Sequence, residues 1–255
     1  MPVHAAAAEG FQAGAAAYER GRPGYPPAAL ELVLSALALI PGAPLLDLGA
    51  GTGTFSRLAA QRGARVLAVE PVAAMRARLA GIPGVQAVAA TAERLPLRDA
   101  SVGGAAAATA FHWFDGRRAL AELHRVLRPG ARVALLWNLR DDAVGWIRSL
   151  TALVDEAERP GVPRYRTGRW REPFGAERAR FHPVGEARFR HVHLLPPEGV
   201  VDRIASISFI AAMAAAARER LLERVRTLLA SHPETAGRAE LPLAYTTDVF
   251  LWERR

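Results

Sequence analysis

A glycine-rich stretch between two short apolar runs constrains the fold of this 255-residue chain more than any other feature. The sequence LLDLGAGTG covers residues 45–53, and a second apolar run, VLAV, covers residues 66–69 and ends at Glu70. Glycine lets the backbone turn tightly or approach a ligand, because it has no Cβ atom. The stretch therefore predicts a buried strand, a tight turn, a helix over residues 54–62 and a second buried strand.

The acids beside this turn indicate the kind of ligand. Glu70, at the end of the second strand, can accept hydrogen bonds from ribose hydroxyls, which indicates a nucleoside-containing cofactor. The glycines are spaced G-x-G-x-G, and Thr54 stands where a dinucleotide fingerprint has its last glycine. Asp47 would repel a pyrophosphate but suits a cationic ligand that carries an amino group. The pattern favours S-adenosylmethionine over a dinucleotide, and a turn that only connects strand to helix is the plainer alternative.

Apolar runs and amphipathic segments alternate through the first 140 residues. Helices are predicted from residue 28, from Pro71 to residue 81, and around residues 120–127, where Arg128-Pro129-Gly130 ends the helix. Further strands are predicted at residues 84–89, 102–109 and 132–137. Strands that alternate with helices of this length imply right-handed crossovers and a mostly parallel sheet with helices on both faces.

The second half of the chain breaks this alternation. Residues 158–183 contain many arginines and aromatic residues interrupted by proline and glycine, which predicts a loop-rich cap. These arginines form either a solvated face or a binding surface. Strands are predicted at residues 187–194 and 245–252, with a helix around residues 221–229.

Composition excludes several kinds of site. The chain has no cysteine, so disulfides, thiolate metal sites and cysteine nucleophiles are excluded. The histidines form no ligand set with acids, and no metal is expected. The net charge of +8 comes from arginine alone, because the chain has no lysine. The absence of a long apolar run and of a basic start before an apolar segment predicts a cytoplasmic protein with no membrane contact.

Several motifs together resemble the class I S-adenosylmethionine-dependent methyltransferases. They are DLGAGTG at residues 47–53, Glu70, AERLPL at residues 92–97 and LHRVLRPG at residues 123–130. The small-molecule branch, methyltransferase type 11, which includes quinone-biosynthesis and trans-aconitate-type enzymes, is the most similar. FHWF at residues 111–114, the tyrosines and Arg-Pro of residues 18–26, and YTTD at residues 245–248 fit the trans-aconitate-type group.

The resemblance implies a Rossmann-like fold with a seven-stranded sheet, and a cofactor site. S-adenosyl-L-methionine would be the cofactor and S-adenosyl-L-homocysteine the product. The residues that would bind it are Asp47, Gly49, Ala50, Gly51, Gly53, Glu70, Pro71, Met75, Ala92, Glu93, Thr109 and Phe111.

Residues after the fourth strand are candidates for contact with the methyl acceptor. His112 follows that strand at the carboxyl end of the sheet and is either a base, a group that positions the substrate, or a hydrogen-bonded part of the pocket wall. Trp113 either faces the sulfonium or packs in the core. Tyr18 and Arg22 either close over the pocket, with Arg22 binding an acidic acceptor, or belong to a solvated N-terminal arm.

The sequence predicts one methyltransferase domain over residues 1–255, with a cofactor-binding core at 28–140 and an N-terminal lid at 1–27. Residues 141–186 would form a loop-rich inserted cap, and the strands and helices of residues 187–255 would complete the sheet. The predicted activity is methylation of a small molecule, at a carboxylate or hydroxyl oxygen, with alignment and exclusion of water as the main catalytic devices. The alternatives are an RNA methyltransferase that uses the arginine-rich cap and a non-catalytic cofactor-binding protein. The chain would act as a monomer or homodimer.

Overall fold

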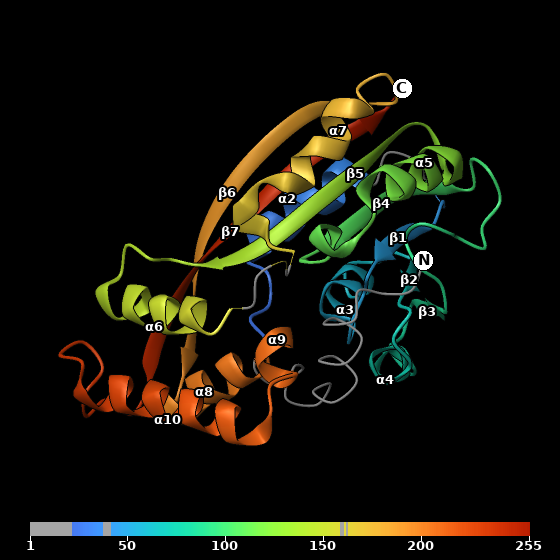
Figure 1. Ribbon diagram of the computed structural model, residues 1–255. Coiled ribbons are helices and arrows are strands. Elements are labelled where there is room, and N and C mark those ends of the chain that lie inside the picture. The colour runs from blue at the N-terminus through green and yellow to red at the C-terminus, as the bar shows by residue number, and fades with distance from the viewer. Residues whose placement is uncertain (1–21, 38–41, 159–160, 162) are drawn as a thin grey trace.

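The computed structural model describes residues 22–37, 42–158, 161 and 163–255. In this part of the chain the strands form one seven-stranded sheet with the order β3-β2-β1-β4-β5-β7-β6 (Figure 1). Their bounds are β1 (Leu45–Leu48), β2 (Val66–Val69), β3 (Val85–Val88), β4 (Val102–Ala108), β5 (Leu127–Arg140), β6 (Phe181–Leu195) and β7 (Leu241–Arg254). Strands β1 to β5 are parallel, and β7 is antiparallel to both β5 and β6. The predicted seven-stranded, mostly parallel sheet is confirmed.

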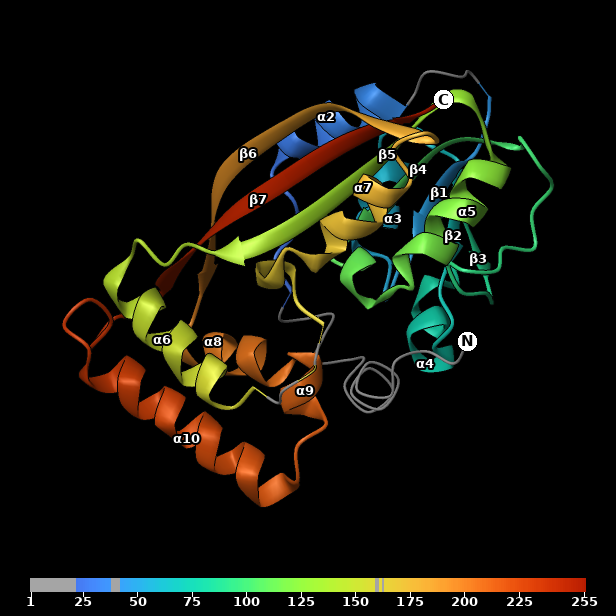
Figure 2. The ribbon, with the colours of Figure 1, turned by 45° about the horizontal axis from the view of Figure 1, so that its top comes forward.

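Helices cover both faces of this sheet. Their bounds are α2 (Pro27–Leu37), α3 (Thr54–Ala60), α4 (Ala73–Arg76), α5 (Gly116–Val126), α6 (Gly145–Glu156), α7 (Glu172–Ala176), α8 (Pro197–Ala205), α9 (Ser208–Ala211) and α10 (Ala215–Ser231). The 3₁₀ turns are η1 (Ala77–Leu79), η2 (Phe111–Trp113), η3 (Tyr165–Thr167) and η4 (Arg169–Arg171). Figure 2 shows α2 on one face, and α5 and α7 on the other.

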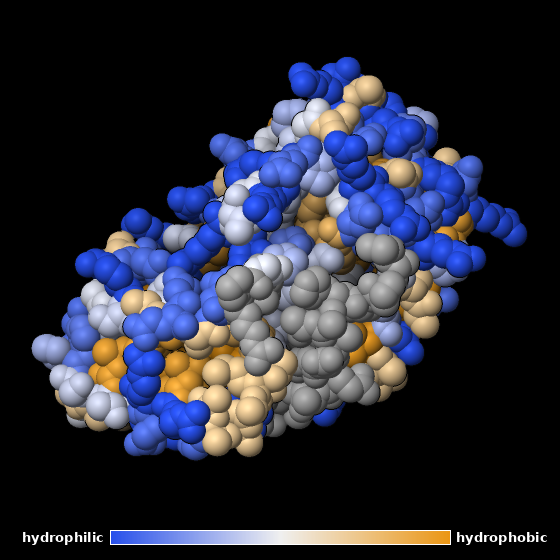
Figure 3. Space-filling model, in the orientation of Figure 1, coloured by the Kyte–Doolittle hydropathy of each residue, from blue (hydrophilic) through white to orange (hydrophobic). Residues whose placement is uncertain are grey.

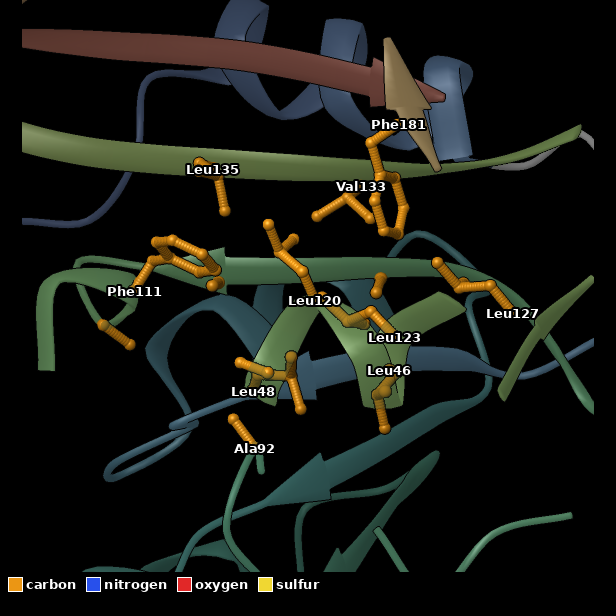
Figure 4. Close-up of a cluster of buried hydrophobic side chains, with 14 of the residues drawn as sticks. Leu46, Leu48, Ala92, Phe111, Leu120, Leu123, Leu127, Val133, Leu135 and Phe181 are labelled. Atoms are coloured by element: carbon orange, nitrogen blue, oxygen red, sulfur yellow. The ribbon is translucent and has the colours of Figure 1, made fainter. Parts of the chain in front are cut away.

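Apolar side chains of the central strands pack on both faces, as expected of a parallel sheet covered by helices. Leu45 of β1 lies in the cluster with α2 and α3, whereas its neighbour Leu46 lies in the cluster with α5. Figure 4 shows the cluster on the α5 side, in which Leu120 and Leu123 of α5 lie with Leu46 and Leu48 of β1. This packing fixes β1, and therefore the turn that follows it.

The strand order reverses between β1 and β4. The chain places β2 and β3 on one side of β1 and then returns to place β4 on the other side. In sheets of this kind, ligands bind at the carboxyl ends of the strands where the order reverses. The glycine turn follows β1 and η2 follows β4, so both lie at this crevice.

A separate hydrophobic cluster lies beyond the carboxyl end of β5. It consists of α6, α8, α9 and α10, packed with the ends of β6 and β7 (Figures 1 and 2). Hydrophobic residues also show at the surface over α6 and α10 (Figure 3), where Leu153 and Leu228 line a groove. Over the described ranges, no helix has the length and apolar character needed to cross a bilayer.

The structure corrects the expectations for the cap. Residues 145–156 form α6 rather than loop, with Trp146, Ile147 and Leu150 on its buried face. Residues 158–183 contain η3, η4 and α7, and β6 already begins at Phe181 rather than at residue 187. The early part of β6 has a register shift between Pro183 and Gly185, which interrupts the alternation by which a strand is recognised.

The end of α5 is also corrected. The helix ends at Val126, and Arg128-Pro129-Gly130 lies inside β5 instead of ending the helix. Leu127 pairs with Val102 before the register shifts to pair Arg132 with Gly104. The residues between Leu127 and Arg132 form an irregular start of β5. Proline and glycine occur both at helix ends and in irregular strands, so the sequence Arg128-Pro129-Gly130 does not distinguish the two.

Candidate active site

The glycine turn between β1 and α3 depends on glycine for backbone geometry and for packing. The φ angles of Gly49, Gly51 and Gly53 are 65°, 58° and 87°. Residues with a side chain rarely adopt such positive φ angles, whereas glycine adopts them readily. A Cβ atom on Gly49 would lie 2.8 Å from the Cβ of Ala110. The turn therefore packs closely on the segment that follows β4, and this brings the two loops of the crevice together.

Asp47 lies beneath this turn and is fully buried. Its Oδ2 accepts a hydrogen bond of 2.5 Å from the Ser56 hydroxyl, while Oδ1 is buried without a hydrogen-bond partner among the described residues. Burial raises the pKa of Asp47 to about 7, the Ser56 hydrogen bond opposes the rise, and the charge of Glu70 adds to it. A buried acceptor without a donor fits an ammonium or sulfonium ligand at this position.

Glu70 joins the glycine turn to the end of β2. Its Oε2 accepts a hydrogen bond of 2.9 Å from the Gly51 N–H, and its Oε1 accepts one of 2.8 Å from the Val72 N–H. Burial raises the pKa of this carboxyl, and the two backbone hydrogen bonds oppose that rise. Each carboxylate oxygen keeps a further lone pair for a ribose hydroxyl.

Thr109, the residue directly after β4, has a strained conformation. Its φ angle is 58°, which is rare for a β-branched residue. Its N–H donates to the Leu136 carbonyl at 2.6 Å, and its Oγ1 lies 3.2 Å from the Tyr25 hydroxyl. Strain of this kind persists where the surrounding structure imposes it, often at functional sites.

Two adjacent cavities open beside these groups. The smaller, of about 40 Å³, is lined by Asp47, Gly49 and Thr109 among others. The larger, of about 360 Å³, is lined by His112, Trp113 and residues of the helices beyond β5. Four residues line both cavities: Arg22, Thr109, Asn138 and Arg203.

The predicted site residues divide between these cavities and the surrounding packing. Asp47, Gly49, Ala50, Thr109, Arg22, His112 and Trp113 line one or both cavities. The other predicted residues line neither of the two cavities: Gly51, Gly53, Glu70, Pro71, Met75, Ala92, Glu93 and Phe111. Among these, Met75, Ala92 and Phe111 are buried, and Glu93 Oε1 accepts a hydrogen bond from the Asp115 N–H at 2.9 Å. The prediction for Tyr18 falls outside the described residues.

His112 is held in one tautomer. Its Nδ1 accepts a hydrogen bond of 3.1 Å from the Trp137 indole N–H, so the neutral ring carries its proton on Nε2. Burial, together with the charges of Arg164 and Arg22, lowers the pKa of His112 to about 3. The imidazole is therefore neutral at physiological pH and offers an N–H donor.

The larger cavity is also lined by three residues that were not among the predicted site residues: Asn138, Arg140 and Arg203. Asn138 accepts a 2.6 Å hydrogen bond from the Thr247 hydroxyl and donates one of 2.9 Å to the Gly24 carbonyl. It thereby holds the segment before α2 against the sheet. A signal did exist for Asn138 and Arg140, because polar residues at the carboxyl end of a parallel strand commonly line the ligand crevice. No local pattern pointed to Arg203.

An aromatic cluster fixes the cap segment on the sheet beside the larger cavity. The Trp137 ring lies 4.5 Å from that of Trp170 and 5.0 Å from that of Tyr165. The Tyr165 hydroxyl donates to the buried carboxylate of Asp248, which also binds Arg188. The arginines of the cap take different environments: Arg164 lines the larger cavity, while Arg178 is exposed.

Within the described ranges, no cluster of at least three histidine or acidic side chains could hold a metal ion. The donors and acceptors of the site are thus backbone amides, carboxylates, guanidinium groups and one neutral imidazole. This set can bind a cofactor with a ribose and a cationic group next to an anionic small molecule.

Comparisons with known proteins agree with this site. A family model for a methyltransferase domain matches residues 46–135. The uncharacterized methyltransferase Rv3342 of Mycobacterium tuberculosis is 40% identical over 238 residues, which is 93% of this chain and 92% of the relative. A malonyl-[acyl-carrier protein] O-methyltransferase of Methylococcus capsulatus is 45% identical over 101 residues, 37% of each chain. A solved structure from Anaeromyxobacter dehalogenans, described as a type II methyltransferase, is 26% identical in sequence and superposes with a TM-score of 0.66. The match covers 91% of this chain and 97% of the other.

The strand order, the glycine turn with its two acids and these relatives define a class I S-adenosylmethionine-dependent methyltransferase. The chain belongs to this methyltransferase family, and its cofactor is S-adenosylmethionine. The resemblance drawn from the sequence motifs is confirmed.

Proposed function

We propose that the chain methylates a carboxylate oxygen of a small molecule that binds in the larger cavity. The observation that carries this proposal is the set of arginines around that cavity, next to a site that suits the cofactor. A volume of about 360 Å³ suits a metabolite-sized acceptor. The O-methyltransferase from Methylococcus capsulatus, whose name gives malonyl-[acyl-carrier protein] as its substrate, supports an acidic acceptor.

The unpartnered Oδ1 of Asp47 supports a role in binding the cationic end of the cofactor. Glu70 has lone pairs for the ribose, and Pro71, Met75, Ala92 and Glu93 are proposed to lie along the adenine. Thr109 and Phe111 are proposed to lie near the methyl donor. When bound, the cofactor supplies an activated methyl group on a sulfonium centre.

The chain's own residues would then align the acceptor and exclude water. A carboxylate acceptor is already a nucleophile and needs no base, whereas a hydroxyl acceptor does. His112 is a poor base at neutral pH, because its pKa is about 3. We assign it the role of a hydrogen-bond donor that orients the acceptor.

Residues 1–27 are proposed to act as a lid, residues 141–186 as a cap and residues 28–140 as the cofactor-binding core, with residues 187–255 completing the sheet.

A methyl-transfer screen with radiolabelled cofactor tests this function. The panel contains mono- and polycarboxylic acids, phenols, amines and total RNA. We expect label in carboxylic acids, and the product should lose its label at high pH because methyl esters hydrolyse there. Label in RNA, phenols or amines but not in acids would contradict the proposal. Cofactor binding without turnover on any acceptor would favour a non-catalytic role.

A further inference from the structure

Arg203 is a buried cation held by neutral groups. It lies on α8 and is 5% exposed. Its Nε donates to the Tyr245 hydroxyl at 3.2 Å, and its Nη1 donates to the Ser206 hydroxyl at 3.3 Å. These contacts orient the guanidinium but do not neutralise its charge. Because Arg203 lines both cavities, its charge faces the space between the cofactor site and the acceptor site.

Arg140 adds a second charge to the same cavity. It is the last residue of β5, and its Nε donates to the Thr151 hydroxyl at 2.9 Å. That hydroxyl in turn donates to Asp142 at 2.8 Å, so Arg140 reaches a carboxylate only through another side chain. Burial, together with the charge of Arg203, lowers the pKa of Arg140 to about 10, which still leaves it charged at neutral pH.

The carboxylates near this pair are bound elsewhere. Asp142 and Asp155 both pair with Arg166 at 2.9 Å, and Glu158 pairs with Arg164 at 2.7 Å. Across the described ranges, no carboxylate lies within ion-pair distance of Arg140 or Arg203. Two like charges in a cavity, each removed from water, are unfavourable unless an anion joins them.

We propose that Arg140 and Arg203 form a subsite for a second anionic group of the methyl acceptor, either a carboxylate or a phosphate. This inference rests on the proposed function and deepens it, because it makes the acceptor an anion at two positions. A guanidinium binds such groups through directed N–H donors, and burial strengthens the contact. His112 lines the same cavity, so the reacting oxygen and the second anionic group would lie in one pocket.

The alternative is that Arg203 only ties α8 to β7 through Tyr245. This alternative predicts that its loss changes stability but not the choice of ligand. It also leaves Arg140 without a role in binding, since Arg140 contacts Thr151 rather than Tyr245.

Binding of small anions tests the subsite without turnover. Glutarate and inorganic phosphate serve as probes for the two kinds of anion, titrated calorimetrically into protein saturated with S-adenosylhomocysteine. The variants are Arg140→Gln, Arg203→Gln and Arg203→Lys, with Arg62→Gln, in the exposed turn after α3, as the matched control. We expect at least one probe to bind the wild type and Arg62→Gln alike. Its Kd should rise at least tenfold in both Gln variants and less in Arg203→Lys.

Equal affinity of the probe for wild type and both Gln variants, or no binding of either probe, would overturn the subsite. The far-UV circular dichroism spectrum shows whether each variant is folded, and Arg140→Gln decides the question if Arg203→Gln fails to fold. With acceptors found in the screen, kcat/KM of both Gln variants should fall at least tenfold for dianionic acceptors and by a smaller factor for monoanionic ones. Arginine-dependent probe binding without methylation of any acid would contradict the proposed function and leave the subsite standing.

Discussion

Burial acts on each ionisable side chain of the site in the direction set by its own charge. It raises the pKa of Asp47 to about 7 and lowers that of His112 to about 3, because removal from water disfavours the charged form of each. The same cause lowers the pKa of Arg140 to about 10, yet this guanidinium remains charged. At neutral pH the site therefore holds fixed cations, a neutral imidazole and a carboxyl close to its midpoint.

Asp47 should make the stability of the ligand-free protein depend on pH. Its pKa rises from 3.8 to about 7 on folding, so the folded state holds the proton more tightly than the unfolded state. Stability should then be greatest below pH 4 for this group and fall as pH rises to about 7, by on the order of 2–4 kcal/mol. Urea unfolding of the wild type and Asp47→Asn at pH 5 and pH 8 measures this, because the Asn variant lacks the titrating group.

The Asn variant should gain stability relative to the wild type as pH rises. Ser56 can still donate to the amide oxygen, so the comparison keeps the hydrogen bond at that position. Parallel pH profiles for the two proteins would show that Asp47 does not titrate in this range.

His112 should leave no ionisation in the activity profile near pH 6.5. The ring is neutral throughout the range from pH 5.5 to 8.5, because its pKa is about 3. A rising limb with a midpoint near 6.5 that disappears in His112→Gln would instead identify a base. The donor role predicts that His112→Leu lowers kcat/KM about tenfold, as expected for one lost hydrogen bond, and that His112→Gln loses less.

At the scale of elements, the sequence predicted those segments whose signals are local. The run from β1 through the glycine turn to β2 was predicted because apolar strands, glycines and terminal acids follow one another within a few residues. The helix α6 was missed because the prolines and arginines after it led to the expectation of a loop over the whole cap. Its apolar positions, from Trp146 to Val154, nevertheless recur at helical spacing.

In the site, as among the elements, the residues with a local sequence signal were predicted and the others were not. Asp47 lies near the carboxyl end of β1, and Glu70 and Thr109 directly follow β2 and β4. The topology of parallel sheets places such residues at one edge. Arg203 reaches the same cavity from α8, because the long strands β6 and β7 carry the later helices back over the carboxyl ends of the sheet. That position depends on tertiary packing, for which one sequence offers no local signal.

The glycine turn allows a test of how tightly two elements are packed. Gly49→Ala should destabilise the protein more than Gly130→Ala, although the φ angles are similar, 65° and 74°. Both changes incur about 1 kcal/mol for a side chain in the left-handed region. A Cβ at Gly49 also lies 2.8 Å from the Ala110 Cβ, whereas nothing lies within 4 Å at Gly130. The added cost of overpacking is about 1–3 kcal/mol.

Unfolding in urea gives the two free energies. The Ala110 Cβ cannot rotate away, so relief requires the segment after β4 to move. Equal destabilisation by the two substitutions would mean that this segment yields freely and that the turn and η2 are not closely packed.

At the scale of the whole molecule, the larger cavity lies between two hydrophobic bodies. Trp137 belongs to the cluster of the sheet and α5, and Tyr245 to the cluster of α6, α8, α9 and α10. Strands β6 and β7 belong to the sheet and reach into the second body. The cofactor groups thus come from the sheet, while both bodies contribute to the proposed acceptor site, so acceptor specificity can vary with the later helices.

The segment of residues 22–25 is tied to the sheet beside the smaller cavity, which Arg22, Pro23 and Tyr25 line. The Asn138 amide donates to the Gly24 carbonyl at 2.9 Å, and Tyr25 contacts Phe55 edge-on with ring centroids 6.3 Å apart. Asn138→Ala should release this segment, because the carbonyl of Gly24 loses its side-chain donor. Hydrogen exchange of the peptide that contains Gly24 and Tyr25 should become faster, and affinity for S-adenosylhomocysteine should fall about three- to tenfold.

Asn138 also donates to the Pro23 carbonyl at 3.5 Å and accepts a hydrogen bond from Thr247, so Asn138→Ala removes the contact to Thr247 together with those to residues 23 and 24. Thr247→Val serves as the control, since it removes the same hydroxyl contact but leaves the Asn138 amide free to bind Gly24. Faster exchange in Asn138→Ala and not in Thr247→Val would establish that the amide holds the segment over the cavity. Equal exchange in both variants, with unchanged cofactor affinity, would mean that Tyr25 and the buried Pro23 anchor it without help from Asn138.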